Sequence, residues 1–285
     1  RRPKRSLSTN IPEGGFAVAE NEPLRLEKEG HVYRVVLSRP EKLNTLTPAL
    51  FEALPRLFQQ LDEDPEVRVV VIQAEGKVFS AGLDLAEAGA WFEPSTADSR
   101  ERLRKRIHGL QGSMDGVESC RKPVIALVHG PCIGGGVDLC CACDIRIASE
   151  DAVFSVREVK LAMVADLGTL QRLPFLIGFG RAAELALTGR DFDAKEALQM
   201  GFITTLCKDK EGLQKEGFRL AQEIAALPPL AVQGIKDTLR FTRDFGPRAS
   251  LSYVAQKNAA ALPSEDLMEA MEAFFQKREP VFQGK

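Results

Sequence analysis

Two short, almost wholly apolar runs constrain the fold of this chain more than any other feature. They are residues 67–73 (Val-Arg-Val-Val-Val-Ile-Gln) and residues 123–129 (Pro-Val-Ile-Ala-Leu-Val-His). Runs of this length and composition are typical of strands buried on both faces, as in a parallel sheet covered by helices. Alternating residues 31–37 predict another strand. Further short strands are predicted at residues 145–148, 152–156 and 202–206. We therefore expect an α/β fold.

Helical patterns separate these strands and then take over completely. Thr47 followed by Pro48 predicts a helix start, because threonine caps helices and proline suits the first helical position. A charged helix is predicted at about residues 96–120. Beyond residue 210, apolar spacings of three and four predict four helices, at residues 213–227, 230–245, 248–261 and 265–278. The expected organisation is an α/β core at residues 23–207 and a helical region at residues 208–285.

The first 22 residues show no periodicity and carry four cations before the first acidic residue, Glu13. We expect a disordered basic tail at residues 1–22. A basic, serine-containing and acid-poor start also resembles the remnant of an organelle transit peptide, which favours a mitochondrial location. The chain does not end in the peroxisomal signal Ser-Lys-Leu. Peroxisomal and cytoplasmic locations nevertheless stay open.

The overall charge excludes several classes of partner. The chain has 38 Lys plus Arg and 40 Asp plus Glu, so its formal charge is -2. No global basic field is available to hold nucleic acid or an anionic membrane, and we expect neither as a partner. The most apolar stretch, residues 124–143, is interrupted by His129, Pro131, the triple glycine Gly134–Gly136 and Asp138, so no membrane span is expected.

Four of the six cysteines fall within residues 132–143, and Cys140 and Cys143 form a C-x-x-C. A zinc site needs a second pair of ligands at matching spacing, but the chain offers only His129 nearby. We therefore expect no metal site, and we interpret these thiols as small buried residues of a reducing compartment. A metal or redox protein built on Cys140 and Cys143 is kept as an alternative.

Three consecutive glycines, Gly134–Gly136, lie between a predicted buried strand and a predicted helix. Glycine lets a ligand approach the main chain and leaves N–H groups free at a helix start. The glycine patterns of dinucleotide-binding and P-loop proteins are absent, and so is a G-x-S-x-G nucleophile elbow. An oxyanion hole and a purely structural turn both remain open.

Three acids near or beyond the glycines are candidates for proton transfer: Asp138, Glu158 and Asp166. Asp166 has apolar neighbours in the sequence Ala-Met-Val-Ala-Asp-Leu-Gly. Burial among such residues would raise its pKa and suit proton transfer near neutral pH. The alternative is that each acid caps a helix or pairs with Arg157 or Arg172.

The combination of three motifs resembles the enoyl-CoA hydratase/isomerase (crotonase) superfamily over about residues 25–280. The motifs are residues 79–84 (Phe-Ser-Ala-Gly-Leu-Asp), 129–138 (His-Gly-Pro-Cys-Ile-Gly-Gly-Gly-Val-Asp) and 143–146 (Cys-Asp-Ile-Arg). The resemblance implies a spiral of ββα turns with an α-helical C-terminal trimerisation region. It also implies a homotrimer or a homohexamer made of two trimers.

The same resemblance implies an acyl-CoA thioester substrate and no other cofactor, since coenzyme A is part of the substrate. The N–H groups of Leu83 and Gly135 would hold the thioester oxygen while an enolate forms, because positioned donors stabilise that charge. Contacts to coenzyme A are implied at Lys42, Ala81, Leu83 and Asp84.

Within the superfamily, the acids distinguish the reactions. Hydratases carry two glutamates, matched here by Asp138 and Glu158, and usually a glycine, matched here by Asp166. This set is most similar to Δ3,5-Δ2,4-dienoyl-CoA isomerases of unsaturated fatty acid β-oxidation. The resemblance implies that Glu158 serves C2, that Asp166 serves C6, and that Asp138 tunes its neighbours. The direction of that assignment stays open. The alternatives are an enoyl-CoA hydratase and a non-catalytic acyl-CoA- or RNA-binding protein of the same fold.

Overall fold

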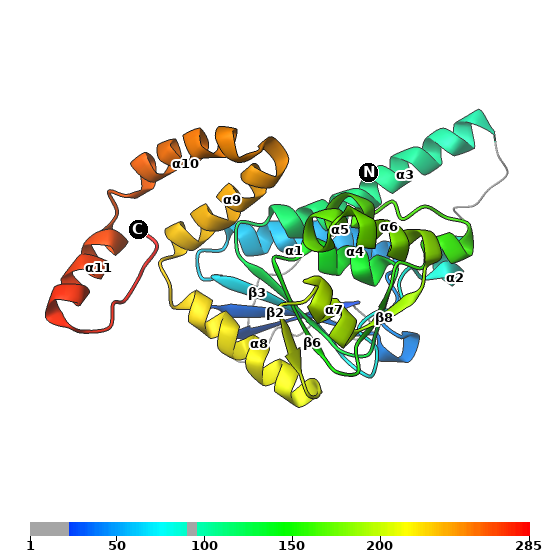
Figure 1. The fold of residues 1–285 in the computed structure, drawn as a ribbon, viewed down its shortest axis with the longest axis horizontal. Coiled ribbons are helices and arrows are strands. Elements are labelled where there is room, and N and C mark those ends of the chain that lie inside the picture. Colours follow the sequence, from blue (N-terminus) through cyan, green and yellow to red (C-terminus); the bar gives the residue numbers. More distant parts are fainter. Residues whose placement is uncertain (1–22, 90–95) are drawn as a thin grey trace, which may run out of the picture.

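The computed structural model describes residues 23–89 and 96–285, so the predicted tail at residues 1–22 lies outside the described part. A six-stranded sheet forms the centre of the molecule (Figure 1). Its first pair is antiparallel and all later pairs are parallel. In spatial order the strands are β1 (Leu24–Glu29), β2 (Val32–Leu37), β3 (Val69–Ala74), β4 (Val124–Val128), β6 (Ile145–Ser149) and β9 (Thr205–Cys207).

A second, three-stranded sheet contains β5 (Pro131–Ile133), β7 (Val153–Ser155) and β8 (Asp191–Asp193). Successive units alternate between the two sheets. In one unit, β4 enters the large sheet and β5 the small one before helix α4 (Gly135–Ala142). In the next, β6 and β7 do the same before α5 (Thr169–Ile177). This repetition confirms the expected spiral of ββα turns.

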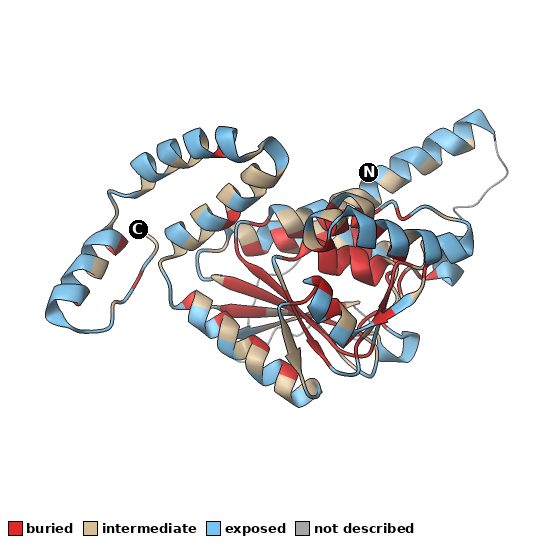
Figure 2. Cartoon of the chain, in the orientation of Figure 1, coloured by how far each residue is buried: buried red, intermediate tan, exposed pale blue. Residues whose placement is uncertain are grey.

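The central strands are buried on both faces, as their apolar runs predict (Figure 2). On β3, Val70 and Ile72 belong to one apolar cluster, which also contains side chains of α1 (Pro48–Glu63) and α3 (Ala97–Ser119). Val69 and Val71 belong to a second cluster, with side chains of α8 (Lys210–Ala225). Successive strand residues point to opposite faces, so one strand serves both clusters.

The predicted helix starts are confirmed by their caps. The Thr47 hydroxyl accepts from the N–H of Leu50 at the start of α1, and Thr96 forms a capping box with Ser99 at the start of α3. The short helices are η1 (Pro40–Lys42), α2 (Leu85–Ala88), η3 (Glu158–Leu161), α6 (Phe179–Thr188) and α7 (Ala194–Met200).

The last three helices extend away from the sheets (Figure 1). They are α9 (Pro229–Phe245), α10 (Pro247–Ala261) and α11 (Glu265–Gln276). Since α8 packs on the large sheet, the part that lies outside the sheets begins at α9. The division at residue 207 stays a prediction. No helix in the described part of the chain is both long and apolar enough to cross a membrane.

One predicted strand is wrong at its start. The apolar run at residues 202–206 suggested a strand, but β9 begins only at Thr205. Phe202 lies in the preceding turn, where its ring contacts Phe154 and Phe192 at centroid distances of 5.2 and 5.8 Å. The residue is apolar because it fills the core between the sheets, and strand pairing plays no part at that position.

Candidate active site

Glycines connect β5 to α4 where bulkier residues would not fit. Gly134 has a φ of 52°, in the left-handed region that favours glycine. A Cβ atom on Gly134 would lie 3.2 Å from Oε1 of Glu158, and one on Gly135 would lie 2.8 Å from Cδ1 of Leu46. The glycines therefore allow the carboxylate of Glu158 to lie against the main chain at the start of α4.

The N–H groups of Leu83 and Gly135 lie on adjacent segments of main chain. A Cβ atom on Gly135 would be 3.9 Å from the nitrogen of Leu83. Leu83 forms a parallel bridge with Leu46. The hydrogen bonds of that bridge run from the N–H of Leu46 to Gly82 (2.8 Å) and from the N–H of Asp84 to Leu46 (3.0 Å). Within the part of the chain that the structure describes, neither predicted donor N–H is used, so both can donate to a ligand oxygen.

The opposite end of α4 is held by a buried cation. The guanidinium of Arg146 donates to the main-chain oxygens of Cys140 (3.1 Å), Cys143 (2.7 Å) and Phe202 (2.7 Å). A cation at the carboxyl end of a helix stabilises its dipole, whose positive end lies at the start. The positive end of the α4 dipole is at Gly135. The helix therefore favours negative charge beside the N–H groups of Leu83 and Gly135.

Asp138 lies on the first turn of α4 and is 1% exposed. Its Oδ1 accepts the N–H and the hydroxyl of Thr169, both at 2.7 Å. Burial raises the pKa of Asp138 to about 6, and the charge of Asp166 acts in the same direction. The Thr169 hydrogen bonds and the charge of Arg172 oppose this shift. Thr169 was not identified from the sequence, although a small hydroxyl residue at a helix start was an available signal.

Glu158 follows β7 and begins η3. Its Oε2 is buried, and no hydrogen-bond partner for it exists among residues 23–89 and 96–285. Burial, together with the negative charges of Asp138 and Asp166, raises the pKa of Glu158 to about 7. A buried carboxylate oxygen without a partner is rare in folded proteins, which makes Glu158 a candidate base.

Asp166 lies in the segment between η3 and α5, and its surroundings differ from those expected. The sequence predicts apolar neighbours, but Asp166 is exposed while Ala165 and Leu167 are buried. The expectation of an apolar lining is therefore wrong for the single chain, because alternate residues of this segment point inward and outward. Partial burial still raises the pKa of Asp166. Its charge also acts on Glu158 and Asp138, so the three predicted acids form one electrostatic cluster.

The alternative was that each acid caps a helix or pairs with Arg157 or Arg172. Its capping half holds for Asp138, which accepts the N–H that begins α5, but its pairing half is wrong for both arginines. Arg157 pairs with Asp191, and Arg172 pairs with Asp115 and Glu118. Asp166 instead lines a polar cleft of about 360 Å³, together with residues of α3, α5 and α9. Its main-chain oxygen accepts from Nε2 of Gln111 at 2.8 Å.

The residues implied for coenzyme A lie on two adjoining segments. Lys42 is exposed at the end of η1, and Ala81 and Leu83 are half-buried. The N–H of Ala81 donates to the oxygen of Leu43 at 3.0 Å, which joins the two segments. The carboxylate of Asp84 is already engaged, because it caps α2 and accepts from Thr45 at 2.9 Å. The main chain of Asp84 is engaged as well, because its N–H donates to Leu46 (3.0 Å) and its oxygen accepts the N–H of Ala88 (2.9 Å).

Asn44 is a supporting residue that was not singled out from the sequence. It is buried, with a φ of 49°, a conformation that asparagine tolerates better than most residues. Its side chain donates to the oxygens of Glu75 (2.9 Å) and Val78 (2.7 Å) and accepts the N–H of Arg39 (2.9 Å). These bonds fasten the loop that carries Lys42.

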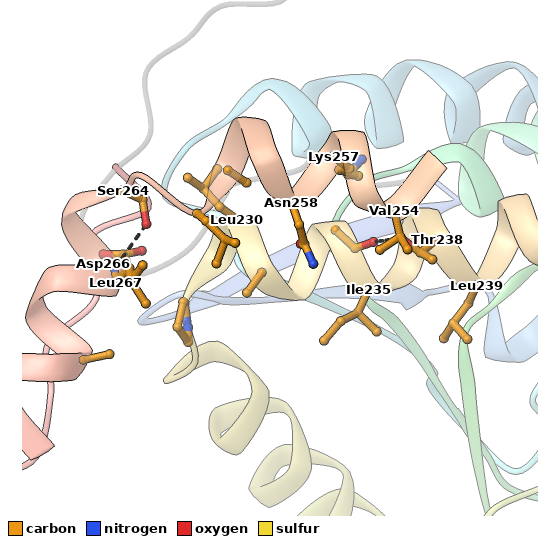
Figure 3. A pocket seen from close by; sticks show the side chains of 16 residues that line it. Leu230, Ile235, Thr238, Leu239, Val254, Lys257, Asn258, Ser264, Asp266 and Leu267 are labelled. Carbon is orange, nitrogen blue, oxygen red and sulfur yellow. Dashed lines mark hydrogen bonds between the residues drawn. The ribbon is translucent and has the colours of Figure 1, made fainter. Parts of the chain in front are cut away.

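A separate apolar pocket of about 400 Å³ lies between α9, α10 and α11 (Figure 3). Leu230, Ile235, Leu239 and Val254 are among the side chains that line it. None of the predicted site residues contributes to this pocket. It therefore belongs to the C-terminal helices and not to the chemistry around α4.

The cysteines behave as small buried residues. Cys140 and Cys143 do not face one another as a pair, because Cys140 contacts Cys132 (Sγ to Sγ 3.7 Å) while Cys143 donates to the oxygen of Leu139. Burial raises the pKa of Cys140, which keeps that thiol protonated. In residues 23–89 and 96–285, no group of three or more His, Cys, Asp or Glu side chains is arranged to hold a metal ion.

Comparisons with known proteins agree with this geometry. A curated peroxisomal Δ3,5-Δ2,4-dienoyl-CoA isomerase from Arabidopsis thaliana is 42% identical, over 92% of this chain and 96% of the relative. A mitochondrial Δ3,5-Δ2,4-dienoyl-CoA isomerase from Dictyostelium discoideum is also 42% identical, over 91% of this chain and 90% of the relative. The solved enoyl-CoA hydratase of Bacillus anthracis is 32% identical with a TM-score of 0.86, covering 93% of this chain and all of that one (100%).

The family comparison covers nearly all of the chain that the structure describes. The family described as enoyl-CoA hydratase/isomerase matches residues 27–285, which include both candidate N–H donors and all three acids. The chain belongs to the enoyl-CoA hydratase/isomerase family.

Proposed function

We propose that this chain is an enzyme that converts 3,5-dienoyl-CoA to 2,4-dienoyl-CoA in the breakdown of unsaturated fatty acids. The observation that carries the proposal is the buried Oε2 of Glu158, which has no partner among the described residues, on a carboxylate that lies against Gly134 at the start of α4. Asp166 belongs to the same electrostatic cluster. The names of the Arabidopsis and Dictyostelium relatives support the same reaction.

The N–H groups of Leu83 and Gly135 hold the thioester oxygen. Removing a proton from C2 moves negative charge onto that oxygen, so donors fixed in advance lower the barrier. One such donor contributes about 10²–10³ in rate in well-studied acyl-transfer enzymes. The start of α4 adds the positive end of its dipole.

Glu158 takes the proton from C2. Its pKa of about 7 suits this step, because a base near the operating pH is partly ionised and still a strong proton acceptor. The electron pair of the broken C2–H bond enters the conjugated system and gives a dienolate that extends to C6. Asp166 then donates its proton to C6, which leaves double bonds at C2 and C4.

Asp138 acts through Glu158 and does not touch the substrate. Both of its bonds to Thr169 go to Oδ1, and its charge helps to raise the pKa of Glu158. The reaction moves one proton and leaves the oxidation state unchanged, so it needs no cofactor beyond the coenzyme A of the substrate. We assign the contacts with that moiety to Lys42, Ala81, Leu83 and Asp84.

We also propose that the chain assembles as a homotrimer or as a hexamer of two trimers. The support is the large number of exposed apolar side chains on α9, α10 and α11, because apolar patches of this extent mark association surfaces. They include Leu230, Ile235, Leu239, Leu251, Met268, Met271, Phe274 and Phe275. Light scattering on the purified protein tests this assembly.

For the compartment we propose mitochondria, with peroxisomes as the other location found among the named relatives. Imaging of the tagged full-length protein in its own cells tests this assignment.

The function is tested by offering the purified protein 3,5-dienoyl-CoA and 2-enoyl-CoA side by side. Ultraviolet absorbance follows the conjugated 2,4-diene, and the loss of the enoyl chromophore follows hydration. We expect turnover of the diene and little hydration. Efficient hydration with no turnover of the diene would make the chain a hydratase. Tight acyl-CoA binding without turnover of either compound would make it a non-catalytic binding protein.

A further inference from the structure

Arg172 is a buried cation beside the site that the mechanism above does not use. Its Nε and Nη2 donate to Oε2 of Glu118 at 2.9 and 2.7 Å, and Nη2 also donates to Oδ1 of Asp115 at 2.6 Å. On its other side, Nη1 donates to the oxygen of Leu167 at 3.4 Å. One guanidinium therefore joins two carboxylates of α3 to the segment that carries Asp166.

The shape of that segment depends on this contact. Gly168 has a φ of 125°, and a Cβ atom there would lie 1.7 Å from Nη1 of Arg172. The guanidinium therefore occupies the space of a side chain at position 168. The next residue, Thr169, donates two hydrogen bonds to Asp138, and Asp166 lies two residues before Gly168. The turn of residues 166–169 therefore packs against the guanidinium of Arg172.

Glu118 is a fixed anchor for Arg172. Its side chain is 16% exposed, and its Oε1 is bound by Nη1 of Arg243, on α9. Burial opposes ionisation of Glu118, but the hydrogen bonds from Arg172 and Arg243 outweigh it and lower the pKa. An ionised carboxylate with a cation on each oxygen keeps the guanidinium of Arg172 in one orientation.

We propose that Arg172 is a positioning residue, which holds the turn of residues 166–169 so that Asp166 and Asp138 keep their places in the site. The inference rests on the proposed function for the roles of these two acids. Lysine cannot replace Arg172 here, because one ammonium cannot reproduce the planar set of donors that reaches Glu118, Asp115 and Leu167 together.

The positive charge of Arg172 also reaches Asp138, whose ionised form it favours. The charged groups that surround the guanidinium, or that act on the acids beside it, come from five elements. They are Asp115 and Glu118 of α3, Asp138 of α4, Glu158 of η3, Asp166 of the connecting segment, and Arg243 and Asp244 of α9. Removing the cation leaves six carboxylates beside one remaining cation, so the acids of the site should ionise at higher pH.

The test uses Arg172→Lys and Arg172→Gln, with Arg190→Gln as the control. Arg190 also bridges two carboxylates, Glu184 and Glu196, but lies far more exposed and outside the site. A displaced catalytic group costs about 10- to 100-fold in rate. We therefore expect both Arg172 variants to lose that much kcat, with KM within about threefold of wild type because the coenzyme A contacts are intact. Only Arg172→Gln should move the acidic limb of the kcat/KM profile to higher pH.

Glu118→Gln is the second variant, because it keeps Arg172 and weakens only its anchor. It should lower kcat and leave KM unchanged, and circular dichroism should show all variants folded. The inference is overturned if folded Arg172→Lys and Glu118→Gln proteins turn over like the Arg190→Gln control and folded Arg172→Gln leaves the acidic limb unmoved. A wild type without isomerase activity would instead overturn the proposed function, and this inference with it.

Discussion

Thr169 donates both its N–H and its hydroxyl to a single carboxylate oxygen of Asp138, each at 2.7 Å. The two residues are almost completely buried. Because Thr169 is the first residue of α5, its N–H has no partner within that helix. Asp138 of α4 therefore lies at the start of α5 and joins these two helices, which precede and follow Glu158 in the chain. The charge of Asp138 also helps to raise the pKa of Glu158.

Thr169→Val removes the hydroxyl bond but keeps the N–H bond to Asp138. A hydrogen bond to a charged group contributes about 1.5–3 kcal/mol, so we expect the free energy of unfolding to fall by about that amount at pH 8. The pKa of Asp138 should rise above about 6. Denaturant unfolding measures the first effect and carboxylate NMR titration the second. Thr169→Ser is the matched control, and its lost methyl should cost only about 0.8 kcal/mol. Equal stability of the two variants at pH 8 would refute a role for the hydroxyl.

Glu158→Gln should change how stability depends on pH. The pKa of Glu158 is about 7 in the folded protein, against an ordinary value of 4.5. An acid whose pKa rises on folding contributes its full stability below the unfolded pKa and loses it as pH rises through the folded pKa. The wild type should therefore lose stability relative to Glu158→Gln between about pH 4.5 and pH 7, on the order of 3 kcal/mol in all.

Thermal unfolding of both proteins from pH 4 to pH 8 measures this difference. Glu150→Gln serves as the control, because Glu150 is exposed and should follow the wild type at every pH. A Glu158→Gln protein that parallels the wild type throughout would mean that the carboxyl group is not held in a raised-pKa environment.

Lys42→Ala should raise KM for acyl-CoA substrates and leave kcat nearly unchanged. Lys42 is exposed, so its removal leaves the fold intact, and an exposed ion pair to a phosphate contributes up to about 1 kcal/mol, or about fivefold in KM. Steady-state kinetics at low salt measures the effect. Lys105→Ala removes another exposed lysine, on α3, and should leave KM as it is. If both substitutions change KM alike, the effect is one of overall charge and Lys42 makes no contact.

Much of the fold could be predicted because it depends on local patterns. The apolar runs of β3 and β4 and the cap at Thr47 carry their own signals. The strands β5 and β8 were not predicted, since three residues are too few to show a period and their pairing with β7 depends on distant segments. The edge strand β1 was also missed, because its second half is exposed and charged.

The site likewise divides into features with a local sequence signal and features that depend on contacts between distant segments. The identities of Glu158, Asp138 and the two N–H donors could be predicted from motifs. The exposure of Asp166 could not, because it depends on which way the segment before α5 turns. The engagement of Asp84 with α2 and the contacts of Arg172 with α3 likewise arise only when distant elements meet.

The central claim is that Glu158 and Asp166 serve opposite ends of the diene. Turnover of 3,5-dienoyl-CoA in D2O, analysed by NMR of substrate and product, tests it most directly. The wild type should place deuterium at C6 of the product. Glu158→Gln should abolish exchange of the C2 proton, whereas Asp166→Asn should lose at least about 10² in net isomerisation and still exchange C2. If both variants isomerise at the wild-type rate with the wild-type deuterium pattern, the two-carboxylate mechanism is wrong.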